Sequence, residues 1–257
     1  METIEFKPTN YPSDLTDTQW KEIEEYFPQG INSTHHKRSL INGGLYLVDN
    51  GCKWRALPHD FPPYSTVHTF YRRARLSGLW EKVLDALAEK TRLETGKNPA
   101  PSYGHRFAKR ENSVRRGGTR DRRGKKTKGR KRHIVVDTLG CILAVTVHAA
   151  NMHDTKAGIL PAAKAFEKYP TLRRFCADAG YRKSFEEAVQ EQLGLGVDIS
   201  QKIKPHQWQV LPWRWVVERT LSWLGHSRRL AKDFEISVHS SEAMICISHL
   251  HTLLRRW

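Results

Sequence analysis

The first apolar residues of the chain recur at the spacing of one helix face. Trp20, Ile23 and Phe27 are three and four residues apart, so all three would face a core if the segment is helical. Thr16 precedes this run and Gln19 follows three residues later, which is the pattern of a capping box. The pattern therefore predicts a helix that begins after Thr16.

Two further apolar segments continue the helical pattern. Residues 40–49 predict a second helix, which Asn50-Gly51 would end, and residues 66–92 predict two helices separated at Ser77-Gly78. The pattern therefore predicts a small all-helical domain, which we delimit as residues 1–95.

Strand-like patterns begin at residue 133. Residues 133–137 and 142–149 are rich in β-branched residues and flank Thr138-Leu139-Gly140, which predicts a hairpin. Beyond the hairpin, segments 173–180 and 196–203 predict strands, and segments 153–169, 185–193, 213–225 and 241–257 predict helices. Residues 133–257 therefore predict an α/β domain with an antiparallel hairpin at its front.

The segment between these regions, residues 96–132, fits neither pattern. It has low hydrophobicity and several glycines, and its Lys and Arg residues are dense from residue 101 onward. By composition alone it is a linker or a disordered basic arm.

The charge of the whole chain points to a polyanionic partner. The net charge is +16 and the isoelectric point is near 9.9, for which nucleic acid is the first candidate, although a basic protein without such a partner is the alternative. The four cysteines form no C-x-x-C pair, which argues against zinc and fits a reducing cytosol. The N-terminus does not resemble a signal peptide, and no apolar run approaches the ~20 residues of a membrane span. We expect a cytoplasmic, nucleoid-associated protein.

Two carboxylates are candidates for chemistry. Asp178 follows the apolar Phe175-Cys176-Ala177 and precedes small residues, as ligand groups do at strand ends of open α/β sheets. A turn-forming Asp is the alternative. Glu218 lies among apolar residues, where a carboxylate is either paired or has a task, and Arg214 one turn earlier is its candidate partner in a purely structural ion pair.

A strand Asp and a helix Glu that converge could hold hard divalent cations through oxygen. Two-metal phosphoryl transfer needs at least two carboxylates, and usually three. The sequence contains no H-E-x-x-H, G-x-S-x-G or Walker pattern that would favour another chemistry. Trp208, Trp213, Trp215 and Trp223 surround Glu218, and core packing is the favoured role, with base stacking as a second possibility.

The motifs resemble the DDE transposases of bacterial insertion sequences, in the group around insertion sequences four and five. The N-terminal part is similar in "LTDTQWKEIEEYFP", "NGGLYLVDNGCKWRALPHDFPPYSTVHTFYRR" and "GLWEKV". The C-terminal part is similar in "KGRKRHIVVDTLGCILAVTVHAANMHD", "CADAGYR", "RWVVERTLSWLGHSRRLAKDFE" and "SEAMICISHLHTLLRR". Together these motifs cover nearly the whole chain in the family's order.

The resemblance implies a helical DNA-binding domain followed by a ribonuclease-H-like α/β catalytic domain. In that fold the first Asp lies on the first strand, the second Asp follows the fourth strand, and the Glu lies on a later helix. Asp178 matches the second Asp, Glu218 the Glu and Arg214 the family's Arg, and the carboxylates would bind two Mg²⁺ or Mn²⁺ ions. Leu211 and Gly225 fall where the family has Tyr and Lys, so those two roles stay unassigned.

The first Asp of the family pattern is missing. Relatives carry a run similar to "IDSQSVKT" about 20 residues before "KGRKRH", where this chain has "GHRFAKRENS". Asp137 and Asp154 belong to other matched segments, and Glu111 and Asp121 lie in no apolar strand. The chain therefore lacks one of three expected metal ligands, and we expect weakened stability and little or no catalysis.

The genetic code suggests how the Asp was lost. Back-translation of residues 103–113, read one nucleotide downstream, permits Met-Ala-Ile-Asp-Ser-Gln-Ser-Val-Lys-Thr, and the shifted Asp codon straddles those of Arg106 and Phe107. Residues 120–124 likewise permit Gly-Ile-Asp-Ala, as in the family. Our hypothesis is that residues 103–124 are an out-of-frame translation of the first catalytic strand, bounded by two compensating frameshifts.

The function that the resemblance implies is DNA transposition. The protein would bind the terminal inverted repeats of its element as a homodimer, cut DNA at their ends and join them to target DNA, with this copy impaired. A remnant that only binds DNA is the alternative, and a basic RNA-binding protein ranks far below. The residues that we expect to contact DNA are Lys125, Lys126, Lys128, Arg130, Lys131 and Arg132 of the in-frame basic run, and Arg72 and Arg73 of the helical domain.

Overall fold

The computed structural model describes most of the chain in two units. The described residues are 6–30, 33–112, 120–122, 125–177, 181, 184–199 and 212–256, with the backbone alone for 105–112, 120–122, 125–128, 155 and 212–214. Unit 1 consists of Met1–Leu87, Leu224–Ala231 and Ala243–Trp257, and unit 2 of Ala88–Trp223 and Lys232–Glu242.

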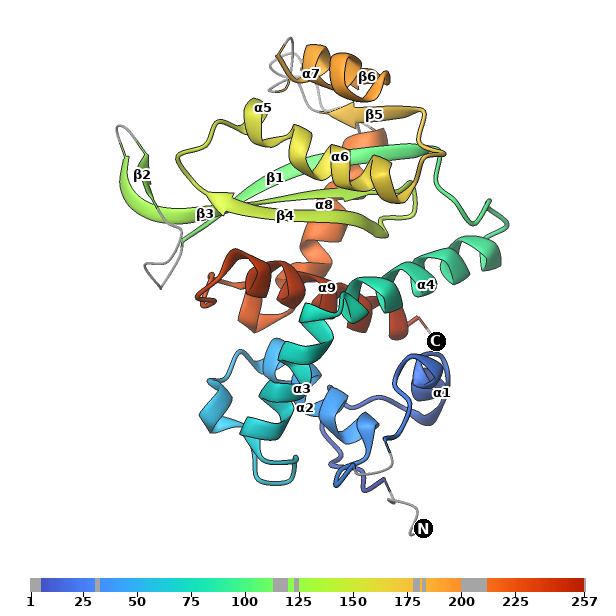
Figure 1. Cartoon of the computed structure of the whole chain (residues 1–257), viewed down its shortest axis with the longest axis vertical. Helices are drawn as coiled ribbons and strands as arrows, with labels where there is room; N and C mark the ends of the chain where they lie inside the picture. The colour runs from blue at the N-terminus through green and yellow to red at the C-terminus, as the bar shows by residue number, and fades with distance from the viewer. Residues whose placement is uncertain are drawn as a thin grey trace. The chain divides into compact units, whose positions relative to one another are not determined.

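Helices build unit 1 (Figure 1). Thr16 caps α1 (Asp17–Lys21) through the predicted capping box with Gln19, but this helix is shorter than predicted and is followed by the 3₁₀ turn η1 (Glu24–Tyr26). Then come α2 (Lys37–Asn50), η2 (Trp54–Ala56), α3 (Tyr64–Leu76), α4 (Leu79–Glu94), whose last residues belong to unit 2, and η4 (Arg228–Leu230). The predicted ends of two helices are confirmed, because Gly51 and Gly78 both have positive φ, at 70° and 69°.

The last helix belongs mostly to unit 1, although the sequence groups it with the catalytic domain. In α9 (Val238–Leu254), residues from 243 onward lie in unit 1, and Ile245, Leu250 and Leu253 are fully buried there. A helix that is apolar on most of its circumference must be covered on several sides. The helices of unit 1 supply that cover, so this unit is assembled from both halves of the chain.

His249 of α9 makes the stability of unit 1 depend on pH. Burial, reinforced by Arg256, lowers the pKa of its imidazole from 6.5 to about 3. Between those values the unfolded chain binds the proton and the folded chain does not, so stability is complete above pH 6.5 and falls as the pH drops toward 3. We expect a loss of about 2 kcal/mol between pH 6.5 and pH 5, measured by urea unfolding.

The matched variants are His249→Met, which should flatten this pH dependence, and His226→Met, which changes an exposed histidine and should preserve it. His251, whose pKa burial also lowers, to about 4, should leave a smaller residual slope in the first variant. An unchanged slope in His249→Met would contradict the assignment.

A mixed sheet forms the centre of unit 2. Its strands are β1 (Tyr103–Asn112), β2 (Arg120–Arg122), β3 (Lys125–Val136), β4 (Ile142–Ala149), β5 (Arg174–Ala177) and β6 (Gly196–Ile199). The order is β2-β3-β1-β5-β6, with β4 also paired to β3. Strand β3 runs antiparallel to β1, β2 and β4, whereas β5 runs parallel to β1 and to β6.

The basic segment that composition assigns to a linker contains the central strand of this sheet. The backbone of β1 pairs with β3 over residues 105–112 and with β5 over residues 103–105. Strand β3 also begins eight residues before the predicted strand at 133. β1 is a strand because its backbone pairs with a neighbour on each side. Composition describes only side chains, so it does not predict this strand.

Helices cover the sheet of unit 2 on two faces. In Figure 1, α6 (Ile159–Lys168) crosses in front of the strands, and α8 (Pro212–Gly225) runs behind them. The fully buried Phe175 of β5 and Phe185 of α7 (Ser184–Leu193) pack in one apolar cluster with residues of α6. The helix predicted over 153–169 is divided, because α5 (Asp154–Ala157) ends before Gly158. No helix among the described residues is long and apolar enough to cross a membrane.

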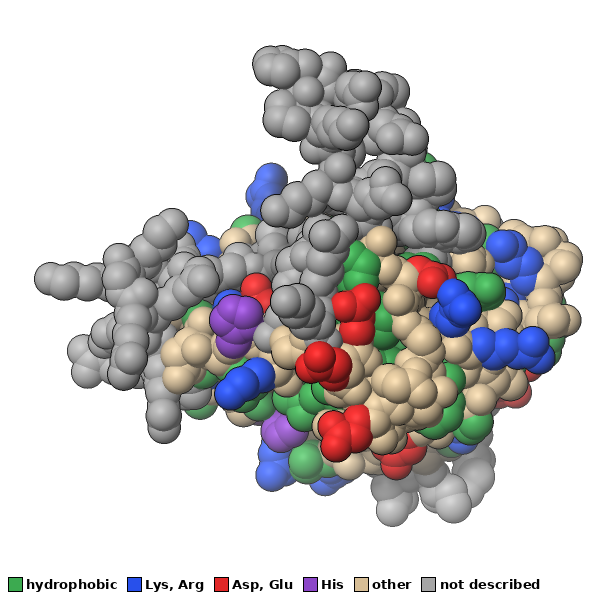
Figure 2. All heavy atoms as spheres, turned by 90° about the horizontal axis from the view of Figure 1, so that it is seen from above, with side chains coloured by type: hydrophobic (Ala, Val, Ile, Leu, Met, Phe, Trp, Pro, Cys, Tyr) green, Lys and Arg blue, Asp and Glu red, His purple; other side chains and the backbone are tan. Residues whose placement is uncertain are grey.

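The charge of the chain is unevenly distributed. Figure 2 shows that acidic side chains gather on part of the face seen from above, and that Lys and Arg side chains lie toward its margins. The exposed acids of α7 and β6 include Glu187, Glu191 and Asp198. A net positive charge therefore does not make every surface attractive to a polyanion.

Candidate catalytic centre

The end of β5 leads directly to the second expected carboxylate. Phe175, Cys176 and Ala177 are buried in the sheet, as their apolar character predicts. Burial raises the pKa of the Cys176 thiol to about 11, which keeps it protonated and unreactive. Asp178 is the next residue in the chain, and it lies outside the described residues.

The register of β1 gives the position of residue 106, where the out-of-frame hypothesis puts the family's first Asp. His105 pairs with Cys176 of β5, and Arg106 pairs with Val135 of β3. Residue 106 is therefore one position beyond the last β1–β5 pair, beside the end of β5 from which Asp178 follows. The shifted reading frame would place Asp at this same position, and the chain has Arg.

Helix α8 carries Glu218 on its exposed face. Val216, Val217 and Thr220 are buried, whereas Glu218 is exposed. Helical periodicity turns the buried neighbours to the other side of α8, so apolar residues beside Glu218 in the sequence do not bury its carboxylate. Arg214 lies in the first turn of α8, and its side chain is not among those described, so the Arg214–Glu218 pair stays a prediction.

Residues next to Glu218 fasten α8 to the turn between β3 and β4. Arg219 donates a hydrogen bond to the carbonyl of Leu139 at 2.8 Å, and Thr220 Oγ1 donates to the carbonyl of Gly140 at 2.9 Å. The Arg219 guanidinium also lies 4.3 Å and 4.8 Å from the ring centroids of Trp215 and Trp223. These contacts fix the position of α8, the helix that carries Glu218, relative to the β3–β4 turn of the sheet.

Gly140 permits this close approach, and Gly140→Ala tests it. Its φ is +83°, and an added Cβ would lie 2.7 Å from Thr220 Oγ1 and 3.1 Å from Trp223. We expect Gly140→Ala to lower the free energy of unfolding by about 2–4 kcal/mol, from backbone strain plus overpacking. Gly194→Ala is the control, since Gly194 has φ +66° with nothing within 4 Å and should lose the strain component only. Equal losses in the two variants, measured by urea unfolding, would contradict the role of the turn.

The four tryptophans near Glu218 in the sequence do not share one environment. Trp215 is 50% exposed and Trp223 is partly buried, both against Arg219, so core packing does not describe Trp215. The side chain of Trp213, like all of Trp208, lies outside the described part of the chain.

Three residues of the basic run are internal, which corrects their assignment to DNA contact. Arg130 is 0% exposed and forms an ion pair with Asp233 at 3.0 Å. Lys131 pairs with Asp154 at 2.5 Å, and Arg132 is also buried. These three residues lie on the part of β3 that pairs with β1 on one side and β4 on the other, and both faces of the sheet are covered there.

The remaining basic candidates keep their assignment as predictions. Lys125, Lys126 and Lys128 lie on the part of β3 that pairs with β2, and their side chains are not described. Arg72 and Arg73 are exposed on α3.

Asp137 is excluded as the missing catalytic Asp because it belongs to another matched motif, and the structure gives it a structural role. Its carboxylate is fully buried, bonds Arg92 at 2.6 Å and accepts the backbone N–H groups of Leu139 and Cys141 at 2.9 and 2.8 Å. Both carboxylate oxygens of Asp137 are therefore already occupied by hydrogen bonds and are not available to a metal. The same bonds fix the turn that α8 packs against.

The donor set does not fit a two-ion site. Across the described ranges no group of three or more His, Cys, Asp or Glu side chains could hold a metal. The two acids that match the family pattern are Glu218 and Asp178, of which Asp178 lies outside the described residues, and residue 106, beside the end of β5, is an arginine. Two ions that share a phosphate usually need three carboxylates, so one ligand is absent.

The chain combines a mixed α/β unit, with candidate carboxylates after strand β5 and on the later helix α8, with a helical unit, which is the arrangement expected of a DDE transposase. Two family models match the chain: "Putative transposase of IS4/5 family" over residues 15–84 and "Transposase DDE domain" over residues 91–253. The second spans more than half of the chain, and the chain belongs to the IS4/5-type DDE transposases.

Two relatives match parts of the chain, and the first of them is named a transposase. The chain is 32% identical over 114 residues to a "Putative transposase for insertion sequence element IS402" of Burkholderia cepacia, which covers 42% of this chain and 54% of the relative. It is 29% identical over 84 residues to the "Uncharacterized protein y4sN" of Sinorhizobium fredii, over 31% of this chain and 67% of the relative. The match thus spans about half the length of the first relative.

Proposed function

We propose that the chain is a transposase that binds the terminal inverted repeats of its own insertion sequence, in a family whose reaction is metal-dependent DNA cleavage and strand transfer. The observation that carries the proposal is the match of the DDE domain model over residues 91–253. The proposed partners are double-stranded DNA, as element ends and as target, and a second copy of the chain, in the cytoplasm at the nucleoid.

The strand order supports a ribonuclease-H-like catalytic unit. If the three-residue β2 is left out of the count, the first four strands in chain order are β1, β3, β4 and β5. Asp178 directly follows the fourth of these strands in the sequence. Glu218 lies on a later helix, as that fold requires. Strand β1 then takes the place of the first strand, where the family has its first Asp.

The incomplete donor set supports impaired catalysis by this copy. DDE transposases generally use divalent metal ions. This chain has Arg106 at the strand position where the family pattern leads us to expect a carboxylate. Substrate binding does not depend on that residue, because the helical unit is separate from the sheet. We therefore expect DNA binding to persist when strand transfer is lost.

The experiment uses the purified full chain and labelled duplexes carrying the DNA that flanks its gene on either side. We expect a mobility shift of these duplexes over a scrambled duplex of equal composition, and no joined product with plasmid target in Mg²⁺ or Mn²⁺. Joined product would refute the impairment, and absence of any preferential shift would refute the end-binding function.

A further inference from the structure

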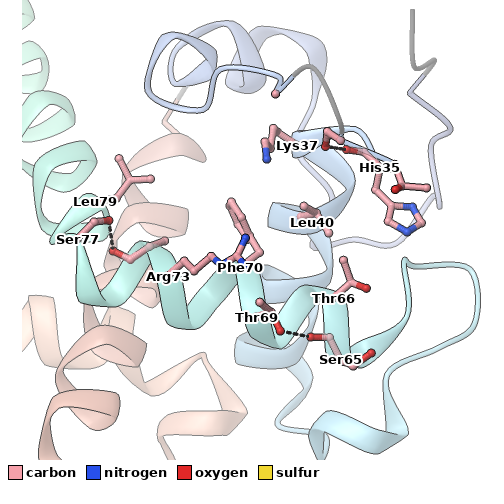
Figure 3. Close-up of a pocket in the computed structure, with 14 residues that line it drawn as sticks. His35, Lys37, Leu40, Ser65, Thr66, Thr69, Phe70, Arg73, Ser77 and Leu79 are labelled. Carbon is pink, nitrogen blue, oxygen red and sulfur yellow. Dashed lines mark hydrogen bonds between the residues drawn. The ribbon is translucent and has the colours of Figure 1, made fainter. Parts of the chain in front are cut away.

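A groove of about 760 Å³ runs along α3 in unit 1 (Figure 3). Its walls come from α3, from the start of α2 and from the segment that precedes α2. Figure 3 shows Ser65, Thr66, Thr69 and Arg73 on α3 and Lys37 on α2 along this groove. Its lining combines hydroxyl and basic side chains with apolar ones, among them Leu40, Phe70 and Leu79. It contains no acidic residue, so its charge favours an anionic occupant.

Helix α3 is amphipathic, and its polar face is the one that borders the groove. Val67, Tyr71 and Ala74 are buried on the inner face. Ser65, Thr69 and Arg73 follow each other at i, i+4 and i+8, so they form one exposed stripe. The unit's stability rests on the inner face, which leaves the stripe to contact a partner.

Local bonds prepare this stripe for binding. Thr69 Oγ1 donates to the carbonyl of Ser65 at 2.8 Å, which holds the threonine in one rotamer and leaves its oxygen able to accept. A side chain that is already ordered loses little entropy when it contacts a ligand.

The charge of α3 is uncompensated. The helix contains no Asp or Glu between Tyr64 and Leu76. Arg72 and Arg73 are exposed, and within the described part of the chain neither guanidinium group forms an ion pair or a hydrogen bond. Arginines that are held on one helix without acidic partners are suited to the phosphates of a nucleic acid.

We propose that α3 enters the major groove of the element's terminal repeat and reads its sequence. Its 13 residues give a helix about 20 Å long, and the major groove, about 12 Å wide, admits one helix. The hydroxyls of Ser65, Thr66 and Thr69 lie in the N-terminal half, which contacts base edges in helix-turn-helix proteins, and Arg72 and Arg73 contact phosphates. This inference rests on the proposed end binding and assigns it to one helix.

The connection between α2 and α3 differs from that of the common helix-turn-helix. Residues 51–63 separate the helices, where that motif has a turn of about three or four residues. The assignment of α3 therefore comes from its exposed stripe and its charge, and not from the motif.

The test measures binding of the purified full chain to a duplex carrying its gene's flanking end and to a scrambled duplex, over a series of salt concentrations. Arg73→Gln should weaken binding to both duplexes and reduce the slope of log K against log salt by about one. Thr69→Val, nearly isosteric, should reduce discrimination between the duplexes about tenfold without changing the slope. Arg228→Gln, an exposed arginine on η4 of the same unit, is the charge-matched control and should behave as the parent chain.

The outcomes separate this inference from the function on which it rests. If the parent chain prefers the flanking duplex and both α3 variants bind as it does, α3 is not the reading helix, while end binding stands. If the parent chain shows no preference, both proposals fail. A loss equally large in Arg228→Gln would also overturn the assignment, because the effect would then be one of net charge. Thermal unfolding of each variant checks its fold. If Thr69→Val is destabilised, the binding result for Arg73→Gln decides the assignment of α3.

Discussion

Replacing residues 105–112 with Ile-Asp-Ser-Gln-Ser-Val-Lys-Thr should restore the strand transfer that we propose this copy has lost. The replacement restores a carboxylate through Arg106→Asp, at the position one beyond the His105–Cys176 pair and beside the strand that leads to Asp178. Loss of groups that merely orient metal ligands costs 10–100-fold, so recovery of a ligand should raise strand transfer by at least about 100-fold. Joined donor and target DNA, measured with Mg²⁺ or Mn²⁺, is the readout.

The design retains Gly104, because a Cβ added there would lie 2.8 Å from the Phe175 ring. The matched control is the same replacement with Arg106→Asn, which keeps the strand sequence and removes only the charge. Equal activity of the two proteins would contradict the assignment of residue 106. The nucleotide sequence of codons 100–126 is an independent check, since the hypothesis fails if it does not spell the Asp-Ser-Gln-Ser-Val run in the shifted frame.

Asp233→Leu should destabilise the chain by about 3–5 kcal/mol, because it strands a buried charge. Arg130 is fully buried, and its guanidinium donates to the Asp233 carboxylate at 3.0 Å and to the carbonyls of Glu235 and Ile236 at 3.0 and 2.7 Å. The carboxylate in turn accepts from Ser241 Oγ at 2.8 Å. Urea unfolding of unit 2, followed by circular dichroism, measures the loss.

The double variant Arg130→Met with Asp233→Leu separates the pair from its surroundings. Removing both charges should recover much of the stability, since apolar replacements of buried ion pairs are often neutral or stabilising. Additive losses in the double variant would show that the two residues act separately. Lys21→Gln, an exposed residue of α1, should unfold like the parent chain.

Local signals in the sequence were sufficient for much of the helical unit. The capping box of Thr16 with Gln19 and the positive φ of Gly78 are properties of a few neighbouring residues, so the sequence reveals them directly. The strand β4 was also predicted with its observed ends, because its β-branched run is bounded by a glycine turn.

The features that sequence missed depend on distant partners. Strand β1 is held by β3 and β5, although its own residues have no strand pattern. The partner of Arg130 lies 103 residues away, so the sequence gives no local sign that this arginine is buried in an ion pair. Asp178 and Glu218 are candidates from their sequence context, but only the family resemblance assigns them catalytic roles, because an Asp after a strand and a Glu on a helix are common on structural grounds.

The discontinuous make-up of unit 1 has a consequence for the order in which the protein matures. Residues 1–87 leave the ribosome first, but the buried Ile245 and Leu250 of this unit are synthesised about 150 residues later. Until then the early helices expose the apolar surface that α9 covers. The DNA-reading helix therefore matures only once the catalytic unit has been made, and a prematurely terminated product would not compete for the element's ends.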